Sequence, residues 1–126
     1  MFADALINLY TNDIEAGIRF YRDLLGLEET FRTPREGSPA HIEFRVGGFT
    51  LALSTVEAAK SEHRVDATPG APAMALVFWT DNVDEAYARL TAAGVPSVIA
   101  PRDKGDNRNA LLKDPEGNLV EIVAKI

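Results

Sequence analysis

A few polar side chains lie inside apolar segments of the chain, and these are the first candidates for chemistry. Glu121 lies within the apolar run Leu119–Val123, and Asn8 lies within the run Ala5–Tyr10. A carboxylate or amide placed in such a strand needs a hydrogen-bonding partner. That partner is either another protein group or a ligand, so Glu121 is a candidate acceptor for a ligand amine or hydroxyl.

A second group of candidates lies in the segment His41–Val46. Its polar and apolar residues alternate, which places His41, Glu43 and Arg45 on one face of a strand. This face either lines a cavity or forms a solvated outer edge of a sheet. The other histidine, His63, lies in a separate polar segment. We find no nucleophile with an adjacent base and no phosphate-binding loop, so we predict no catalytic residue.

The length, charge and composition of the chain exclude several classes of binding partner. The chain has 126 residues, which is the length of one domain, and a net charge of −6. This charge argues against nucleic acid, whose binding depends on neutralising phosphates. The lack of cysteine excludes disulfides and thiolate metal sites. No apolar run is long enough to span a membrane and no signal-peptide pattern is present, so we expect a cytoplasmic protein with no membrane partner.

Two stretches of the chain show the same order of predicted elements. Each begins with a strand and a helix and continues with three strands. In the first stretch the elements are Ala5–Tyr10, a helix between Asn12 and Gly26, Leu27–Phe31, His41–Val46 and Phe49–Leu53. In the second they are Ala73–Trp79, a helix between Thr80 and Gly94, Val98–Ala100, and a hairpin that ends with Leu119–Val123. We expect Pro101–Asn107 to be a charged loop.

The repeat extends to individual residues at the helix starts. Tyr10–Ile14 (YTNDI) matches Trp79–Val83 (WTDNV). The sequence therefore predicts an α+β protein of two tandem βαβββ modules that form one domain, 1–126. We place the first module at about 1–55, a polar connector with a weakly helical start at about 56–72, and the second module at about 73–126.

Two motifs identify a resemblance to a known family. The closing turn Asp114–Asn118 (DPEGN) and the helix Asp13–Leu27 resemble segments of the vicinal-oxygen-chelate superfamily, which includes glyoxalases, bleomycin-resistance proteins and extradiol dioxygenases. The resemblance implies that the sheets curl into a cup, with the helices outside and the ligand inside. It also implies that the protein is a homodimer.

Metal-dependent members of that family place four ligands in the cup. By resemblance these positions fall on Leu6, Ala52, Ala75 and Glu121, and only glutamate among them can bind a metal. A catalytic divalent metal needs about three protein ligands. We therefore predict no metal site and no cofactor.

The resemblance also suggests which residues would contact a ligand in the cup. An aromatic wall from Tyr10 and Trp79 would stack on a planar molecule, unless these residues belong to the core or to a dimer contact. The full predicted set is Asn8, Tyr10, His41, Glu43, Ala52, Ala75, Val77, Trp79 and Glu121.

Two functions are compatible with these residues. The first is a metal-free binding protein of the bleomycin-resistance type, which sequesters a planar aromatic or cationic small molecule. The alternative is a metal-dependent enzyme of the glyoxalase or dioxygenase type that acts on vicinal oxygens. Catalysis without a metal, by Glu121 or His41 as general base, is a third possibility.

Overall fold

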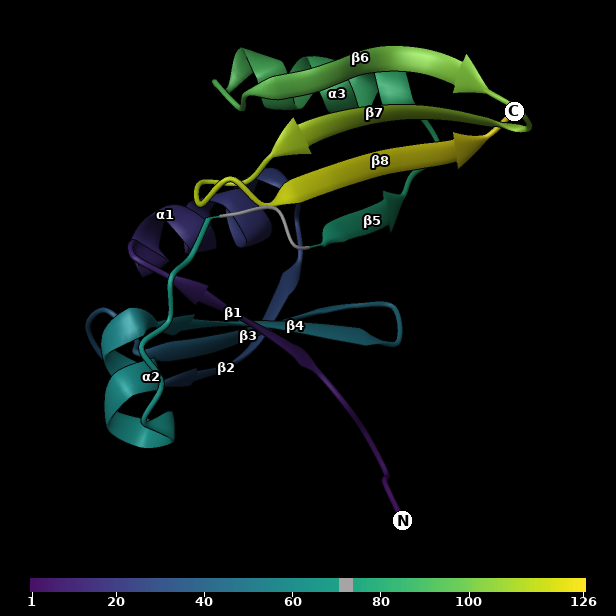
Figure 1. Ribbon diagram of the computed structural model, residues 1–126. Helices are drawn as coiled ribbons and strands as arrows, with labels where there is room; N and C mark the ends of the chain where they lie inside the picture. The colour runs from purple at the N-terminus through teal and green to yellow at the C-terminus, as the bar shows by residue number, and fades with distance from the viewer. Residues whose placement is uncertain (71–73) are drawn as a thin grey trace. The chain divides into compact units, whose positions relative to one another are not determined.

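The computed structural model describes residues 1–70 and 74–126 (Figure 1). Ala73, where we expected the second module and its first strand to begin, lies outside the described residues. The chain divides into two compact units, Met1–Pro69 and Gly70–Ile126. The elements of the first unit are β1 (Ile7–Thr11), α1 (Ile14–Ile18), η1 (Arg19–Leu24), β2 (Glu28–Thr33), β3 (His41–Val46), β4 (Phe49–Thr55) and α2 (Val56–His63). Those of the second unit are β5 (Ala75–Trp79), α3 (Val83–Ala92), β6 (Ser97–Lys104), β7 (Asn107–Lys113) and β8 (Leu119–Lys125).

Each unit contains one four-stranded mixed sheet. The strand order is β1-β4-β3-β2 in the first unit and β5-β8-β7-β6 in the second. In both, the first strand pairs in parallel with the last strand, and the remaining pairs are antiparallel. The two units therefore have the same βαβββ topology, which confirms the predicted α+β class and the duplication.

The first helix covers one face of the first sheet. Asp13 caps it, because its side chain accepts a hydrogen bond from the backbone N–H of Ala16 at 3.0 Å. The helix continues from α1 into the π-helical segment η1 and buries Ile18 and Tyr21. Tyr21 lies over Phe44 of β3, with ring centroids 6.4 Å apart. The other face of this sheet is thus left without α1.

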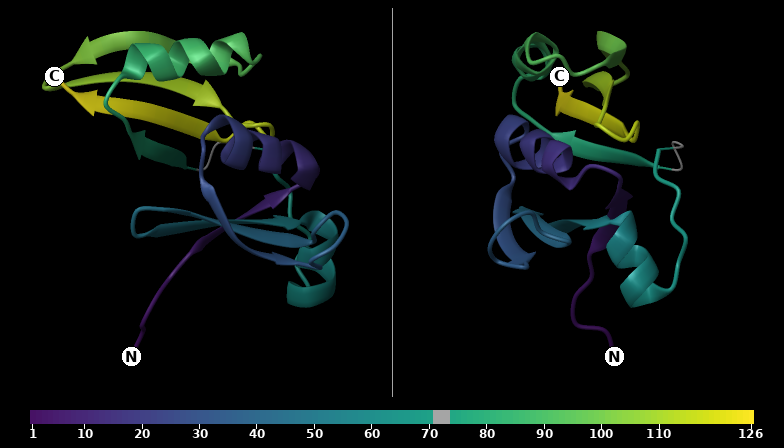
Figure 2. Two further views of the ribbon diagram at one scale, coloured as in Figure 1. Left: turned by 180° about the vertical axis from the view of Figure 1, so that it is seen from behind. Right: turned by 90° about the vertical axis from the view of Figure 1, so that its left-hand side faces the viewer.

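Helix α3 has the same place in the second unit. Asn82 caps it by accepting from the backbone N–H of Glu85 at 3.1 Å, and Val83 and Leu90 are buried. Tyr87, which shares the helical spacing of these two residues, is only half-buried. Its hydroxyl donates to Ser97 at 2.8 Å, so the ring lies at the border of the core where its polar end can be satisfied. Views from opposite sides show α3 on one face of the sheet only (Figures 1 and 2).

The charged segment Pro101–Asn107, predicted to be a loop, is mostly strand. Strand β6 runs to Lys104 and β7 begins at Asn107, so only the turn between them remains. Cross-strand pairing outweighs the polar composition because β6 is an edge strand, where charged side chains reach solvent. Arg108 also binds Asp103 at 2.9 Å and Asp84 of α3 at 2.8 Å, and these two carboxylates raise its pKa.

The polar connector begins as a helix of two turns. The Thr55 side chain caps α2 by accepting from the backbone N–H of Ala58 at 3.0 Å. Arg64, in the left-handed conformation with φ of 57°, ends the helix. In the part of the chain that the structure describes, none of the helices has the length and apolar content needed to span a membrane.

Candidate functional site

The face of the first sheet opposite α1 carries its polar residues. Strand pairing places His41 beside Ser54, Glu43 beside Ala52, and Asn8 beside Ala52. Because side chains alternate along a strand, all five lie on the face opposite the buried apolar residues of β3. We call this side, which α1 does not cover, the open face of the first unit.

A chain of hydrogen bonds connects four of these side chains. Ser54 Oγ donates to Asn8 Oδ1 at 3.1 Å and lies 2.7 Å from His41 Nδ1. His41 Nε2 lies 2.8 Å from Glu43 Oε2. Both ring nitrogens of His41 therefore have protein partners, which hold the imidazole in one orientation and leave neither nitrogen free for a metal.

A cavity of about 650 Å³ lies between this open face and α2. Asn8, His41 and Ser54 line it on the sheet side, and Ala58 and Ala59 line it on the helix side. Ser54 is 5% exposed, so it reaches the cavity from a nearly buried position on β4. This places a buried hydroxyl and an oriented imidazole at the bottom of a partly apolar cavity.

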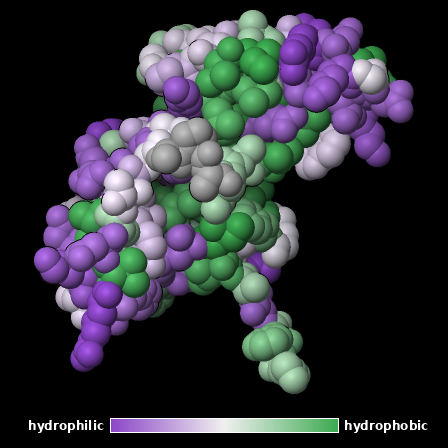
Figure 3. Space-filling model, in the orientation of Figure 1, coloured by the Kyte–Doolittle hydropathy of each residue, from purple (hydrophilic) through white to green (hydrophobic). Residues whose placement is uncertain are grey.

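The corresponding face of the second unit carries exposed apolar side chains on its first strand. Trp79 is 62% exposed and Val77 is 49% exposed, while Leu76, whose side chain points to the opposite face, is buried. In Figure 1 this face is turned to the viewer with α3 behind it, and Figure 3 shows apolar residues gathered there. We call it the open face of the second unit.

Glu121 lies on this second open face in a polar network of its own. Val77 pairs with Glu121, so both side chains are on the side of Trp79. Asn109 Nδ2 donates to Glu121 Oε1 at 2.9 Å, and Arg102 Nε donates to Asn109 Oδ1 at 3.4 Å. Glu121 therefore has a structural partner, and it is only partly buried.

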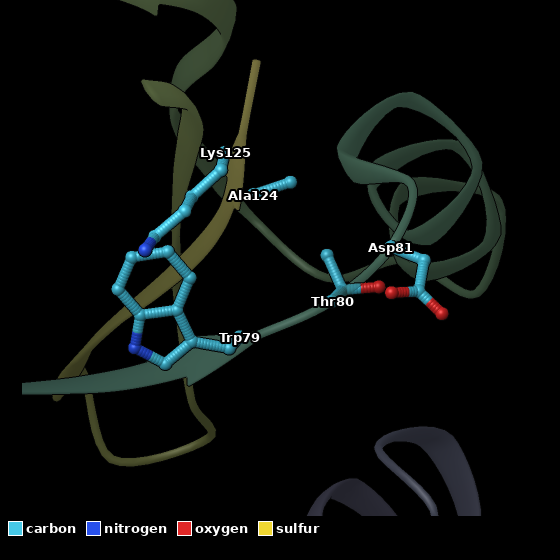
Figure 4. Close-up of a pocket in the computed structure, with 5 residues that line it drawn as sticks. All are labelled: Trp79, Thr80, Asp81, Ala124 and Lys125. Atoms are coloured by element: carbon cyan, nitrogen blue, oxygen red, sulfur yellow. The ribbon is translucent and has the colours of Figure 1, made fainter. Parts of the chain in front are cut away.

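Trp79 also borders a hollow at the end of its strand. A cavity of about 620 Å³ is lined by Trp79, Thr80, Asp81, Ala124 and Lys125 (Figure 4). The figure shows the indole on one side of this hollow and the Asp81 carboxylate on the other. An aromatic face, an anion and a cation thus border one exposed space.

Both the sequence and the fold are similar to those of known proteins. A model of the Glyoxalase/Bleomycin resistance protein/Dioxygenase superfamily matches residues 5–122. The chain belongs to this superfamily. No curated protein matches the sequence.

Several solved structures of the superfamily's fold are similar over nearly the whole chain. A glyoxalase-related enzyme from Fulvimarina pelagi is 27% identical, covers 99% of this chain and 89% of its own, and has a TM-score of 0.82. A glyoxalase/bleomycin resistance protein/dioxygenase family enzyme from Burkholderia phytofirmans PsJN is 26% identical and has a TM-score of 0.81. The similarity covers 98% of this chain and 100% of that enzyme's chain. TioX from Micromonospora sp. ML1 shares the fold at 24% identity, with a TM-score of 0.78. The similarity covers 99% of this chain and 100% of the TioX chain.

The side chains at the four metal positions that the resemblance implies do not fit a metal ion. In the first unit these positions are Leu6 and Ala52, which offer no donor atom. In the second unit Ala75 offers none, and the carboxylate of Glu121 already accepts a hydrogen bond from Asn109. Within residues 1–70 and 74–126, no three His, Cys, Asp or Glu side chains are grouped so that they could hold a metal. We therefore derive no chemistry through a metal.

The predicted ligand-binding residues divide between the two open faces. Those on the first unit are Asn8, Tyr10, His41, Glu43 and Ala52, and those on the second are Ala75, Val77, Trp79 and Glu121. Within the first unit, His41, Glu43 and Asn8 are linked by hydrogen bonds through Ser54, whereas Tyr10 contacts His63 at 3.4 Å. Their role in binding stays a prediction.

Three residues of these networks were not predicted as site residues. Ser54, Asn109 and Arg102 each supply a hydrogen bond on an open face. Ser54 follows Ala52 by two positions, and this alternation is the signal that would have placed it beside the predicted residues. The composition of Pro101–Asn107 predicts a loop for Arg102, which conceals its place opposite Asn109 on β7.

Proposed function

We propose that this protein is a metal-free small-molecule-binding protein, which sequesters a planar aromatic or cationic compound on its open sheet faces. The observation that carries the proposal is that Trp79 and Glu121 lie on one face of the second sheet, where Glu121 pairs with Val77 and Val123 pairs with Trp79. A large aromatic side chain that is 62% exposed offers a stacking surface, and a carboxylate on the same face offers an acceptor.

The two residues would recognise different parts of one ligand. Stacking on the indole contributes about 0.5–1.5 kcal/mol beyond the burial of apolar area, and a cationic ring adds attraction to the π-face. Glu121 would accept a hydrogen bond from an amine or hydroxyl, alongside the bond that it already accepts from Asn109. Val77, between them on the face, provides an apolar contact.

The metal-dependent alternative lacks support at the residues that it requires. An enzyme that chelates vicinal oxygens on a metal needs about three protein ligands and an open coordination position. Leu6, Ala52 and Ala75 have no atom that can coordinate a metal. The proposal of metal-free binding follows from this donor set.

The single tryptophan makes the proposal testable by fluorescence. Purified protein is titrated with a panel of planar aromatic compounds, neutral and cationic, in the presence of a chelator. We expect quenching of Trp79 emission, weakened for cationic ligands in Glu121→Gln. Glu36→Gln, an equal change of charge in an exposed loop, is the matched control and should bind as the wild type does. Quenching that requires added metal would refute metal-free binding.

A further inference from the structure

The open face of the first unit holds a serine, a histidine and a carboxylate in series. Ser54 Oγ lies 2.7 Å from His41 Nδ1, and His41 Nε2 lies 2.8 Å from Glu43 Oε2. This is the arrangement of a nucleophile, its general base and the group that orients the base. It arises from three neighbouring positions on β3 and β4, where Ser54 pairs directly with His41.

We propose that the first unit is also a hydrolytic site for carboxylic esters, with Ser54 as nucleophile and His41 as general base. Glu43 is a positioning residue. It accepts a hydrogen bond from His41 Nε2–H, which keeps the lone pair of Nδ1 directed toward Ser54. The proposal goes beyond ligand sequestration. It does not use Trp79 or Glu121, so either proposal can fail without the other.

The position of the protons determines whether Ser54 is activated. A serine hydroxyl has one hydrogen, which it donates either to Asn8 Oδ1 or to His41 Nδ1. When the ring is neutral and Nε2–H donates to Glu43, Nδ1 has a lone pair and accepts the Ser54 proton. Asn8 Oδ1 lies 3.1 Å from Ser54 Oγ. Once the Ser54 proton points to His41, the Asn8 amide can turn its NH₂ group toward the oxygen of a bound carbonyl.

The reaction balances with water as the only co-reactant. Ser54 Oγ attacks the ester carbonyl carbon while His41 Nδ1 takes the hydroxyl proton, and the tetrahedral adduct loses the alcohol, which leaves with that proton. A water molecule then gives a proton to Nδ1 and attacks the acyl-serine. The serine oxygen leaves and regains the proton, and the carboxylic acid is released.

The cavity under α2 indicates which esters would enter. Pro34, Ala40 and Ala58 make part of its lining apolar, which suits a short acyl chain. Glu57 and Glu62 also line it, and none of the described lining residues is lysine or arginine. Neutral and cationic esters should therefore be accepted, while esters that carry a carboxylate or phosphate should be excluded.

The direct test is covalent labelling of the wild-type protein with a fluorophosphonate probe, because such probes react with activated serines. The labelled residue is located by mass spectrometry of the digested protein. We expect a single adduct on Ser54, no adduct in Ser54→Ala, and a labelling rate at least about 100-fold lower in His41→Gln. Ser38, which donates to Glu15 at 2.8 Å, has no histidine partner, so Ser38→Ala should label as the wild type does.

The role of Glu43 requires a readout that a structural defect would not reproduce. Glu43→Gln should lower the labelling rate and the hydrolysis rate of p-nitrophenyl butyrate, while Trp79 emission and the unfolding midpoint stay unchanged. Glu43→Asp should restore part of the rate because it restores the negative charge. A wild-type protein that is not labelled, or is labelled at a serine other than Ser54, overturns the proposal. Ester hydrolysis that persists in Ser54→Ala also overturns the proposal.

Discussion

Ala52 and Glu121 occupy equivalent positions in the two units. Ala52 pairs with Asn8 of β1, and Glu121 pairs with Val77 of β5. Asn8 and Val77 each lie the same number of residues before the cap of the following helix. Duplication thus places a methyl group in one unit where the other has a carboxylate, so the first unit has no donor side chain at this position.

The first prediction concerns metal content. Purified protein should contain no stoichiometric zinc, nickel, iron or manganese by elemental analysis, because three of the four superfamily positions lack donor atoms. A chelator should leave the melting temperature unchanged. A melting temperature that falls with chelator and recovers with one metal would contradict this prediction.

The second prediction compares two leucines of the helices. Leu90 is 2% exposed, whereas Leu24 is only half-buried. Leu90→Ala should lower the free energy of unfolding by about 2–5 kcal/mol, since it removes buried area and leaves a cavity. Leu24→Ala should lower the free energy of unfolding by a smaller amount. Urea denaturation of both variants measures the difference, and equal losses would show that burial in the two units does not decide the cost.

The third prediction concerns the turn before β8. Asp114 is 5% exposed and accepts from the backbone N–H groups of Glu116 at 2.9 Å and Asn118 at 2.8 Å. Asp114→Ala leaves these donors without their partner, so we expect a loss of about 1–3 kcal/mol in unfolding free energy. Asp106→Ala, in the exposed turn between β6 and β7, is the control. No difference between the two variants in thermal unfolding would count against this role.

The fourth prediction concerns acid stability. Hydrogen bonds from Arg32, and then from Arg22, hold the pKa of Glu29 below its ordinary value of 4.5. Because the folded pKa is lower than the unfolded one, Glu29 stabilises the fold at pH values above 4.5. This contribution is lost as the pH falls from there through the folded pKa. Urea denaturation between pH 7 and pH 3 should show a shallower loss in Glu29→Gln than in the wild type.

The fifth prediction is a homodimer. Each sheet has two edge strands, which are β1 and β2 in the first unit and β5 and β6 in the second. Pairing between copies would cover such edges, and most soluble oligomers are symmetric dimers. Light scattering at micromolar concentration should give twice the mass of the 13.7 kDa chain. A monomer under these conditions would contradict the prediction.

Local sequence patterns predicted the features that depend on neighbouring residues in the chain. The first helix begins next to Asn12, with Asp13 as its cap, and Gly26 has the positive φ, 78°, that ends it. Alternation along His41–Val46 correctly separated the buried Ile42 and Phe44 from the polar side chains, although Val46, at the end of the strand, is exposed. These features follow from helix and strand periods, which a few consecutive residues specify.

Only the tertiary structure determined which polar side chains meet. Ser54 and His41 are 2.7 Å apart because β3 and β4 pair in one register, and a shift by one residue would turn the side chains of one strand to the other face. The bond from Asn109 to Glu121 depends in the same way on β7 and β8. Register between strands is set by the packing of the whole apolar face, which no short segment of the sequence contains.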